Sequence, residues 1–232
     1  MPKLPGGPLA TRPLHFIFIA DCSGSMAGDK IQSLNQAIRE AIPHMREVAK
    51  GNPNAEVLVR SIKFESGAQW HQSQPTNVET FEWIDLSTGG TTSMGMALSL
   101  VAGALKTPPM PERALPPVLV LISDGEPTDD FDGGLRTLMA EPWGKKAVRL
   151  AIAIGEGVRL DVLQRFIGHN EIQPLVAKNS DQLVKYIRWA STAVLQAASA
   201  PASQTRAAPP GVNVPLPPPP LATAPSDPNE VW

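Results

Sequence analysis

The chain lacks several features that define large classes of protein. It has 232 residues and one cysteine, Cys22, which excludes an intramolecular disulfide and a thiolate zinc cluster within the chain. The formal net charge is -2, so charge gives no general reason to bind nucleic acid or an anionic membrane. No apolar run approaches the ~20 residues of a membrane-spanning helix, and residues 1–8 lack the apolar core of a signal peptide. We therefore expect a soluble, cytoplasmic protein that binds neither nucleic acid nor membrane.

Proline is unevenly distributed along the chain. Ten of the 25 prolines follow residue 200, and the aliphatic residues there show no helical or strand period. This composition predicts a disordered or polyproline-type tail. Either the tail is solvated and has no specific role, or residues 216–221 dock in an aromatic-lined groove on a partner. We expect an N-terminal extension at 1–13, a folded domain at 14–199 and a proline-rich disordered tail at 200–232.

Apolar patterns between these ends predict alternating strands and helices. Continuous or alternating apolar residues predict strands at 14–20, 55–64, 118–122 and 147–154, and less clearly at 81–86 and 171–177. Apolar residues at steps of three and four predict helices at 29–50, 93–105, 133–140, 159–168 and 180–198. Pro43 is expected to kink or interrupt the first helix, and Asn179 or Ser180 to cap the last. The alternation predicts an α/β fold with a doubly wound, mainly parallel sheet and helices on both faces.

Three polar segments lie in loops after predicted strands or before a predicted helix. They supply oxygen atoms from Asp21, Ser23 and Ser25, from Thr91 or Thr92, and from Asp124. Sheets of this kind bind ligands beyond the carboxyl ends of their strands, where these loops would meet. Carboxylates and hydroxyls are hard ligands that select Mg²⁺, Mn²⁺ or Ca²⁺ over zinc or copper. Neutral hydroxyl ligands would leave the cation's charge poorly compensated, so an open position would attract an anionic oxygen from a partner.

The order and composition of these segments resemble the metal-ion-dependent adhesion site of von Willebrand factor type A (vWA) domains over residues 14–198. The resemblance implies a Rossmann-like vWA fold and a metal site formed by Asp21, Ser23, Ser25, Thr91 and Asp124. Thr91 matches the second-loop threonine because it lies four residues before Gly95, and Thr92 is the alternative. The resemblance implies a divalent cation, Mg²⁺ first and Mn²⁺ or Ca²⁺ as alternatives, and a protein partner that supplies an Asp or Glu carboxylate.

The sequences of two loops are similar to those of the tellurium-resistance, TerY-like branch of this family. The first reads Asp-Cys-Ser-Gly-Ser-Met-x-Gly and the second Ile-Ser-Asp-Gly-Glu-Pro-Thr-Asp. This branch implies a cytoplasmic protein in bacterial stress-response or defence systems. It often works beside a Ser/Thr protein kinase and a PP2C-type phosphatase.

Other interpretations of the same residues stay open. We expect no catalytic activity, because neither serine has a nearby His or Lys in sequence to serve as a base. The alternative is a Mg²⁺-dependent phosphohydrolase that uses the same carboxylates; a third possibility is a metal that only stabilises the fold. Cys22 is interpreted as a buried apolar filler rather than a redox sensor. Four acidic residues are interpreted as a solvated loop that attracts cations, with outer metal ligation as the alternative: Glu126, Asp129, Asp130 and Asp132.

Overall fold

A single six-stranded sheet forms the centre of the molecule. The computed structural model describes residues 11–200 and 214–221. The strands are β1 (Arg12–Asp21), β2 (Ala55–Phe64), β3 (Ala68–Asn77), β4 (Val118–Ser123), β5 (Val148–Ile154) and β6 (Leu175–Ala177), in the spatial order β3-β2-β1-β4-β5-β6. All neighbouring strands are parallel except β2 and β3, which are antiparallel. The predicted mainly parallel α/β sheet is confirmed.

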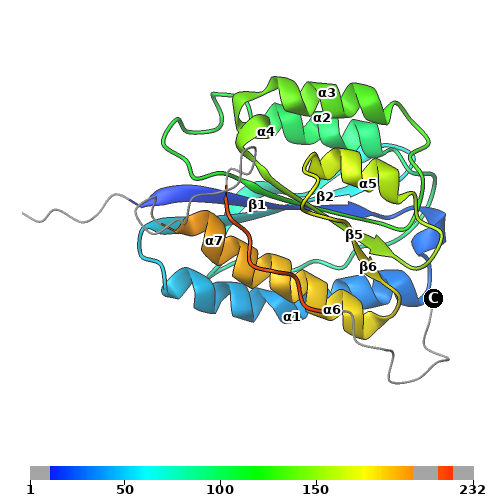
Figure 1. Cartoon of the computed structure of the whole chain (residues 1–232), viewed down its shortest axis with the longest axis horizontal. Coiled ribbons are helices and arrows are strands. Elements are labelled where there is room, and N and C mark those ends of the chain that lie inside the picture. Colours follow the sequence, from blue (N-terminus) through cyan, green and yellow to red (C-terminus); the bar gives the residue numbers. More distant parts are fainter. Residues whose placement is uncertain (1–10, 201–213, 222–232) are drawn as a thin grey trace, which may run out of the picture.

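Helices cover both faces of this sheet (Figure 1). One layer contains α1 (Asp29–Lys50), α6 (Ser180–Trp189) and α7 (Leu195–Ser199). The opposite layer contains α2 (Met94–Ala104), α3 (Phe131–Ala140), α4 (Pro142–Lys146) and α5 (Leu160–Ile167). Helix α1 has the predicted bounds and continues through Pro43. Within the described part of the chain, no helix has the length and apolar character needed to cross a membrane.

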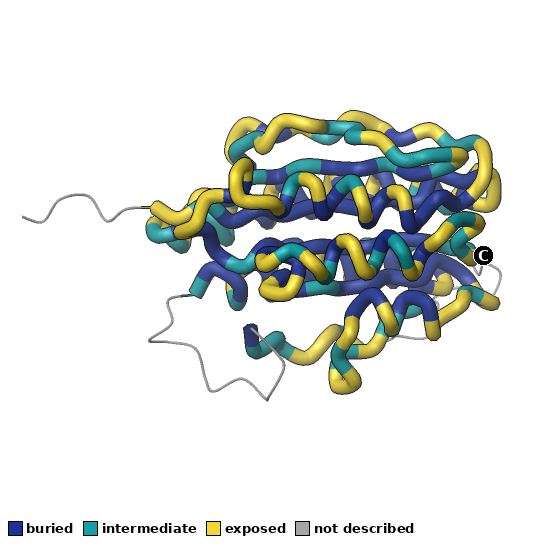
Figure 2. The backbone as a smooth tube through the Cα atoms, turned by 90° about the horizontal axis from the view of Figure 1, so that it is seen from above, coloured by how far each residue is buried: buried dark blue, intermediate teal, exposed yellow. Residues whose placement is uncertain are grey.

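Strand β1 shows why the sequence of a central strand is a continuous apolar run. Phe16 and Phe18 belong to the core under α1, α6 and α7, whereas Ile17 and Ile19 belong to the core under α2, α3 and α5. All four side chains are fully buried, and Figure 2 shows the buried strands between more exposed helices. A strand covered on both faces needs apolar residues at every position. The first site loop therefore starts from a strand that is buried on both faces.

The structure places the third strand differently from the prediction. Residues 81–86 are not a strand, and β3 instead follows a tight turn in which the Glu65 N–H donates to the Gly67 carbonyl (2.8 Å). The β3 sequence is mostly polar, because an antiparallel edge strand is only partly covered. Asn35 of α1 binds both backbone polar groups of Leu86, at 2.8 Å for its N–H and 3.0 Å for its carbonyl. A helix side chain therefore satisfies backbone groups that a sheet would otherwise pair.

The last strand and last helix also differ from their predicted forms. Strand β6 is limited to three residues and pairs only with Ile152–Ile154 of β5. Pro174 precedes it and has no N–H to continue the ladder. The last helix spans 180–199 but includes a π-helical turn at Ala190–Val194. The Asn179 side chain caps this helix by accepting a hydrogen bond from the Gln182 N–H (3.0 Å). Asn179 is one of the two residues predicted as the cap.

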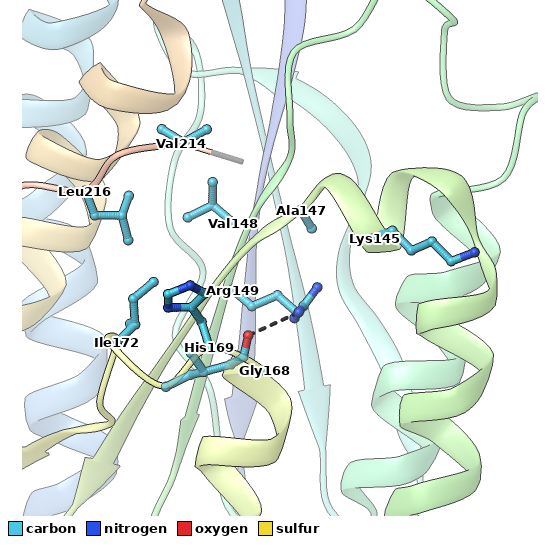
Figure 3. Close-up of a pocket in the computed structure, with 10 residues that line it drawn as sticks. Lys145, Ala147, Val148, Arg149, Gly168, His169, Ile172, Val214 and Leu216 are labelled. Carbon is cyan, nitrogen blue, oxygen red and sulfur yellow. Dashed lines mark hydrogen bonds between the residues drawn. The ribbon is translucent and has the colours of Figure 1, made fainter. Parts of the chain in front are cut away.

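A short proline-rich segment, residues 214–221, lies against the domain and is called the strap below. Val214 is buried and joins the core, and Leu216 packs against it. Figure 3 shows both side chains beside Val148 and Ile172. A hollow of about 440 Å³ lies between the strap prolines, Trp189 and the β5–β6 edge. The expectation of a disordered tail otherwise falls on 201–213 and 222–232, which lie outside the described residues.

Candidate metal centre

Asp21 links the first and third loops at the end of β1. Its side chain is fully buried. Its Oδ1 accepts the Ser23 backbone N–H at 2.8 Å, and its Oδ2 accepts the Ser123 hydroxyl at 2.5 Å. Burial raises the pKa of the Asp21 carboxyl, while the hydrogen bonds from Ser123 and Ser23 act in the opposite direction. Both carboxylate oxygens thus have protein donors, and the carboxylate fixes the relative position of the two loops.

Ser23, Ser25 and Asp124 form a continuous chain of oxygen atoms. The two serine Oγ atoms lie 3.0 Å apart, and the Ser25 hydroxyl donates to Asp124 Oδ1 at 2.8 Å. This convergence follows from the sheet, because β1 and β4 are parallel neighbours with Ala20 opposite Ile122. The loops that leave these strands therefore begin at the same edge. Asp21 joins the chain through the Ser23 backbone, so the structure brings four of the five predicted site residues together.

The second loop packs against the first through its backbone. The Gly24 N–H donates to the Gly90 carbonyl (3.1 Å), and the Gly89 N–H donates to the Cys22 carbonyl (2.8 Å). Gly90 has a φ of +68°, and a side chain there would collide with Ser66. Glycine therefore allows the close approach of the two loops.

The two candidate threonines of this loop have different surroundings. Thr91 is exposed, and its backbone N–H donates to the Ser66 hydroxyl (3.2 Å). Thr92 is buried, and its Oγ1 lies 3.6 Å from the position that a Cβ would take at Gly125. Gly125 directly follows Asp124. The Thr92 hydroxyl therefore faces the third loop, whereas the Thr91 side chain lies at the surface.

The four acidic residues after Asp124 have partners within the fold. Both oxygens of Asp129 accept backbone N–H groups at the start of α2, from Gly95 (2.9 Å) and Met96 (2.8 Å). The remaining contacts join Asp130 to the Gly133 N–H, Glu126 to Arg159, and Asp132 to Arg165. Negative charge at a helix N-terminus is stabilising. These carboxylates therefore hold α2, α3 and the neighbouring loops, a role that the interpretation as a solvated loop missed.

Two further residues touch the site, and neither has a role predicted from the sequence. Ser123 bonds Asp21, and the Lys30 ammonium lies 2.5 Å from Asp124 Oδ2. Ser123 could have been noticed as the last residue of a buried strand, directly before Asp124. Lys30 could have been noticed because it lies in the first turn of α1, where the helix dipole disfavours positive charge.

The donor set fits a hard divalent cation. Among the residues that the structure describes, no three His, Cys, Asp or Glu side chains gather as a metal cluster. A cation here would instead depend on two carboxylates and on hydroxyl groups, which suits Mg²⁺ and related ions. The Lys30 ammonium beside Asp124 shows that the site accommodates positive charge. Cys22 is fully buried, its thiol faces the Ala20 carbonyl (3.8 Å), and burial raises its pKa to about 12, which agrees with the role of a buried apolar filler.

Comparison with known proteins identifies the family and the fold. The profile of the von Willebrand factor type A domain matches residues 16–187. The ArnB paralog VWA2 from Sulfolobus acidocaldarius is similar at 16% identity and a TM-score of 0.57, over 77% of this chain and 45% of that one. Proximal thread matrix protein 1 from the mussel byssus, described with a zinc-occupied MIDAS motif, is similar at 15% identity and a TM-score of 0.58, over 78% and 48%. BatB from Bacteroides thetaiotaomicron is similar at 15% identity and a TM-score of 0.53, over 76% and 96%.

These structural likenesses show a shared fold. The chain spans less than half the length of the archaeal and mussel proteins, and no curated protein matches it significantly. The family profile, in contrast, extends from Phe16 in β1 to Ile187 in α6. With the sheet order and the loop residues in agreement, this protein belongs to the von Willebrand factor type A domain family.

Proposed function

We propose that this protein is a metal-dependent interaction module. A divalent cation is held by Asp21, Ser23, Ser25, Thr91 and Asp124, and an Asp or Glu carboxylate of a partner protein completes its coordination. Mg²⁺ is the expected ion, with Mn²⁺ or Ca²⁺ as alternatives. The observation that carries the proposal is the chain of oxygen atoms from Ser23 through Ser25 to Asp124, which joins residues 99 positions apart.

The hydrogen bonds of the site support a division of roles among its residues. Both oxygens of Asp21 are already bonded within the protein, so Asp21 orients the loops and acts on the ion through water. Ser23 and Ser25 offer hydroxyl oxygens directly. Because these ligands are neutral, the cation keeps enough charge to attract a partner's carboxylate.

The second-loop ligand is the part of the proposal on which two arguments disagree. The family spacing favours Thr91, while burial and closeness to Gly125 favour Thr92. Separate alanine variants decide between them. The threonine that binds the ion is the one whose replacement lowers Mn²⁺ affinity about tenfold or more, a loss of ~1.4 kcal/mol.

The surroundings of the two serines favour binding over catalysis. Their hydroxyls bond each other and Asp124, whereas an activated nucleophile needs a base that is itself oriented by a third group. The zinc in the MIDAS motif of the mussel protein supports a divalent cation at the corresponding place here. A Mg²⁺-dependent phosphohydrolase is the competing function, and it would use the same carboxylates, with Asp21 or Asp124 as nucleophile or metal ligand.

We further propose a biological setting, based on the sequences of the first and third loops. Their resemblance to the TerY-like branch is the support for a role in a cytoplasmic tellurium-resistance, stress-response or defence system. A Ser/Thr kinase and a PP2C-type phosphatase are the expected partners there.

Metal titration of the full chain tests the proposed function. We expect Mn²⁺ to bind the native protein with a 1:1 stoichiometry by calorimetry, and the Ser23→Ala/Ser25→Ala variant to lose this binding while keeping its circular dichroism spectrum. Ser73→Ala, an exposed serine on β3, is the matched control and should bind normally. Absence of Mn²⁺ binding in the native protein refutes the proposal. Hydrolysis of a phosphomonoester that Asp124→Ala abolishes would instead establish the phosphohydrolase.

A further inference from the structure

Lys30 covers the carboxylate that the metal needs. Its Nζ lies 2.5 Å from Asp124 Oδ2. The Asp124 side chain is only 1% exposed, whereas the Lys30 side chain is 24% exposed. The ammonium therefore occupies a position beside this oxygen that an arriving cation would have to take. Lysine has a long flexible stem and a strongly hydrated head, so it can withdraw into water.

The position of Lys30 in α1 is locally unfavourable. It is the second residue of the helix, directly after Asp29, and lies in a turn where the helix dipole repels cations. On an exposed helix surface this placement has no advantage. Here the Asp124 carboxylate offsets the repulsion, so the lysine gains its stabilisation from the metal site rather than from its own helix.

We propose that Lys30 is an internal competitor of the divalent cation. This inference rests on the proposed metal site. Without metal, the ammonium neutralises the charge of Asp124. It thereby reduces the electrostatic repulsion between Asp124 and the buried Asp21 carboxyl. When the metal binds Asp124, the ammonium leaves, because a dication and an ammonium cannot share one carboxylate oxygen at hydrogen-bonding distance without strong repulsion. Lys30 thereby lowers the metal affinity and keeps the metal-free domain stable.

The proposal predicts opposite effects of one substitution with and without metal. Lys30→Gln removes the competitor, so we expect Mn²⁺ to bind about tenfold more tightly, equivalent to ~1.4 kcal/mol. In chelator the same substitution leaves Asp124 without its cation, so we expect the midpoint of thermal unfolding to fall by ~2–4 °C. Saturating Mn²⁺ should then raise this midpoint more in Lys30→Gln than in the native chain.

The experiment is a calorimetric Mn²⁺ titration and a thermal unfolding series on four full-length chains. They are the native protein, Lys30→Gln, Lys30→Arg and Lys50→Gln. Lys50→Gln makes the same charge change at the exposed far end of α1 and should behave like the native protein. Lys30→Arg keeps the positive charge and should retain the weaker, native affinity.

The outcomes separate this inference from the proposed function. Tighter Mn²⁺ binding by Lys30→Gln alone supports the competition. Equal affinity in the native and Lys30→Gln chains refutes the competition but leaves the metal site intact. Weaker binding by Lys30→Gln also refutes it, because Lys30 would then assist the metal. If no chain binds Mn²⁺, the proposed function fails and the competition fails with it.

Discussion

Removal of the Ser123 hydroxyl is the most direct test of how the two central loops are joined. The hydroxyl donates to Asp21 Oδ2 at 2.5 Å, and the Asp21 side chain is fully buried. Ser123→Ala leaves this oxygen without its donor, and water cannot easily replace it. Hydrogen bonds to charged groups contribute about 1.5–3 kcal/mol, and an unsatisfied buried charge adds to the loss. We therefore expect the free energy of unfolding to fall by ~3 kcal/mol.

Urea unfolding in the presence of chelator measures this loss without interference from metal. With a slope of ~2 kcal/mol per M, a loss of ~3 kcal/mol lowers the urea midpoint by ~1.5 M. Ser99→Ala is the matched control, because its hydroxyl donates only to the Gly95 carbonyl within α2 (3.0 Å). That variant should lose about 0.5 kcal/mol or less.

A double-mutant cycle isolates the bond itself. In an Asp21→Asn background the acceptor is neutral, so Ser123→Ala should cost only ~1 kcal/mol. Two results would refute the reasoning: a loss below ~1 kcal/mol in the native background, or equal losses in both backgrounds. Either would mean that the Asp21 carboxylate is not held by Ser123.

Two further predictions concern the second loop and the response to acid. Gly90→Ala should cost at least ~2 kcal/mol and weaken Mn²⁺ binding, because it combines a φ of +68° with a collision against Ser66. Gly157→Ala, at a φ of +79° with open space around it, should cost only ~1 kcal/mol and leave binding unchanged. Urea unfolding and calorimetry measure both, and equal effects would contradict the packing argument. Burial, with Arg60 nearby, lowers the pKa of His15 from 6.5 to about 4. Below pH 6.5, His15 therefore binds a proton in the unfolded chain but not in the folded chain. The free energy of unfolding should consequently fall by ~2–3 kcal/mol between pH 6.5 and 4.5. His15→Gln should reduce this slope, and an unchanged slope would disprove the assignment.

The sequence predicted the central sheet well because both faces of its strands are covered. Such strands need apolar residues throughout, and β1 and β4 stand out for that reason. Strand β3 escaped prediction because an edge strand can be polar, and residues 81–86 misled because Phe81 and Leu86 are buried outside the sheet. Burial alone therefore does not distinguish a strand from a well-packed loop.

The site residues were predictable only where they follow strands in chain order. Asp21, Ser23, Ser25 and Asp124 meet as expected because β1 and β4 are parallel neighbours. Sequence spacing favours Thr91 over Thr92, but it could not show that Thr91 lies at the surface and its neighbour Thr92 is buried. The contributions of Ser123 and Lys30 arise from contacts between distant segments, and their identity alone does not reveal those contacts.

The strap also covers part of the sheet edge formed by β5. Among the residues that the structure describes, β6 pairs with Ile152–Ile154 and leaves the earlier part of β5 without a paired strand on that side, and the strap lies along that stretch. Five of its eight residues are proline, which has no N–H, so the strap shields the strand without extending the ladder. A chain shortened before Val214 would offer bare backbone groups of β5 to its neighbours in solution. Loss of these residues would thus expose an unpaired sheet edge. Such an edge can pair with a strand of another copy and lead to self-association and precipitation.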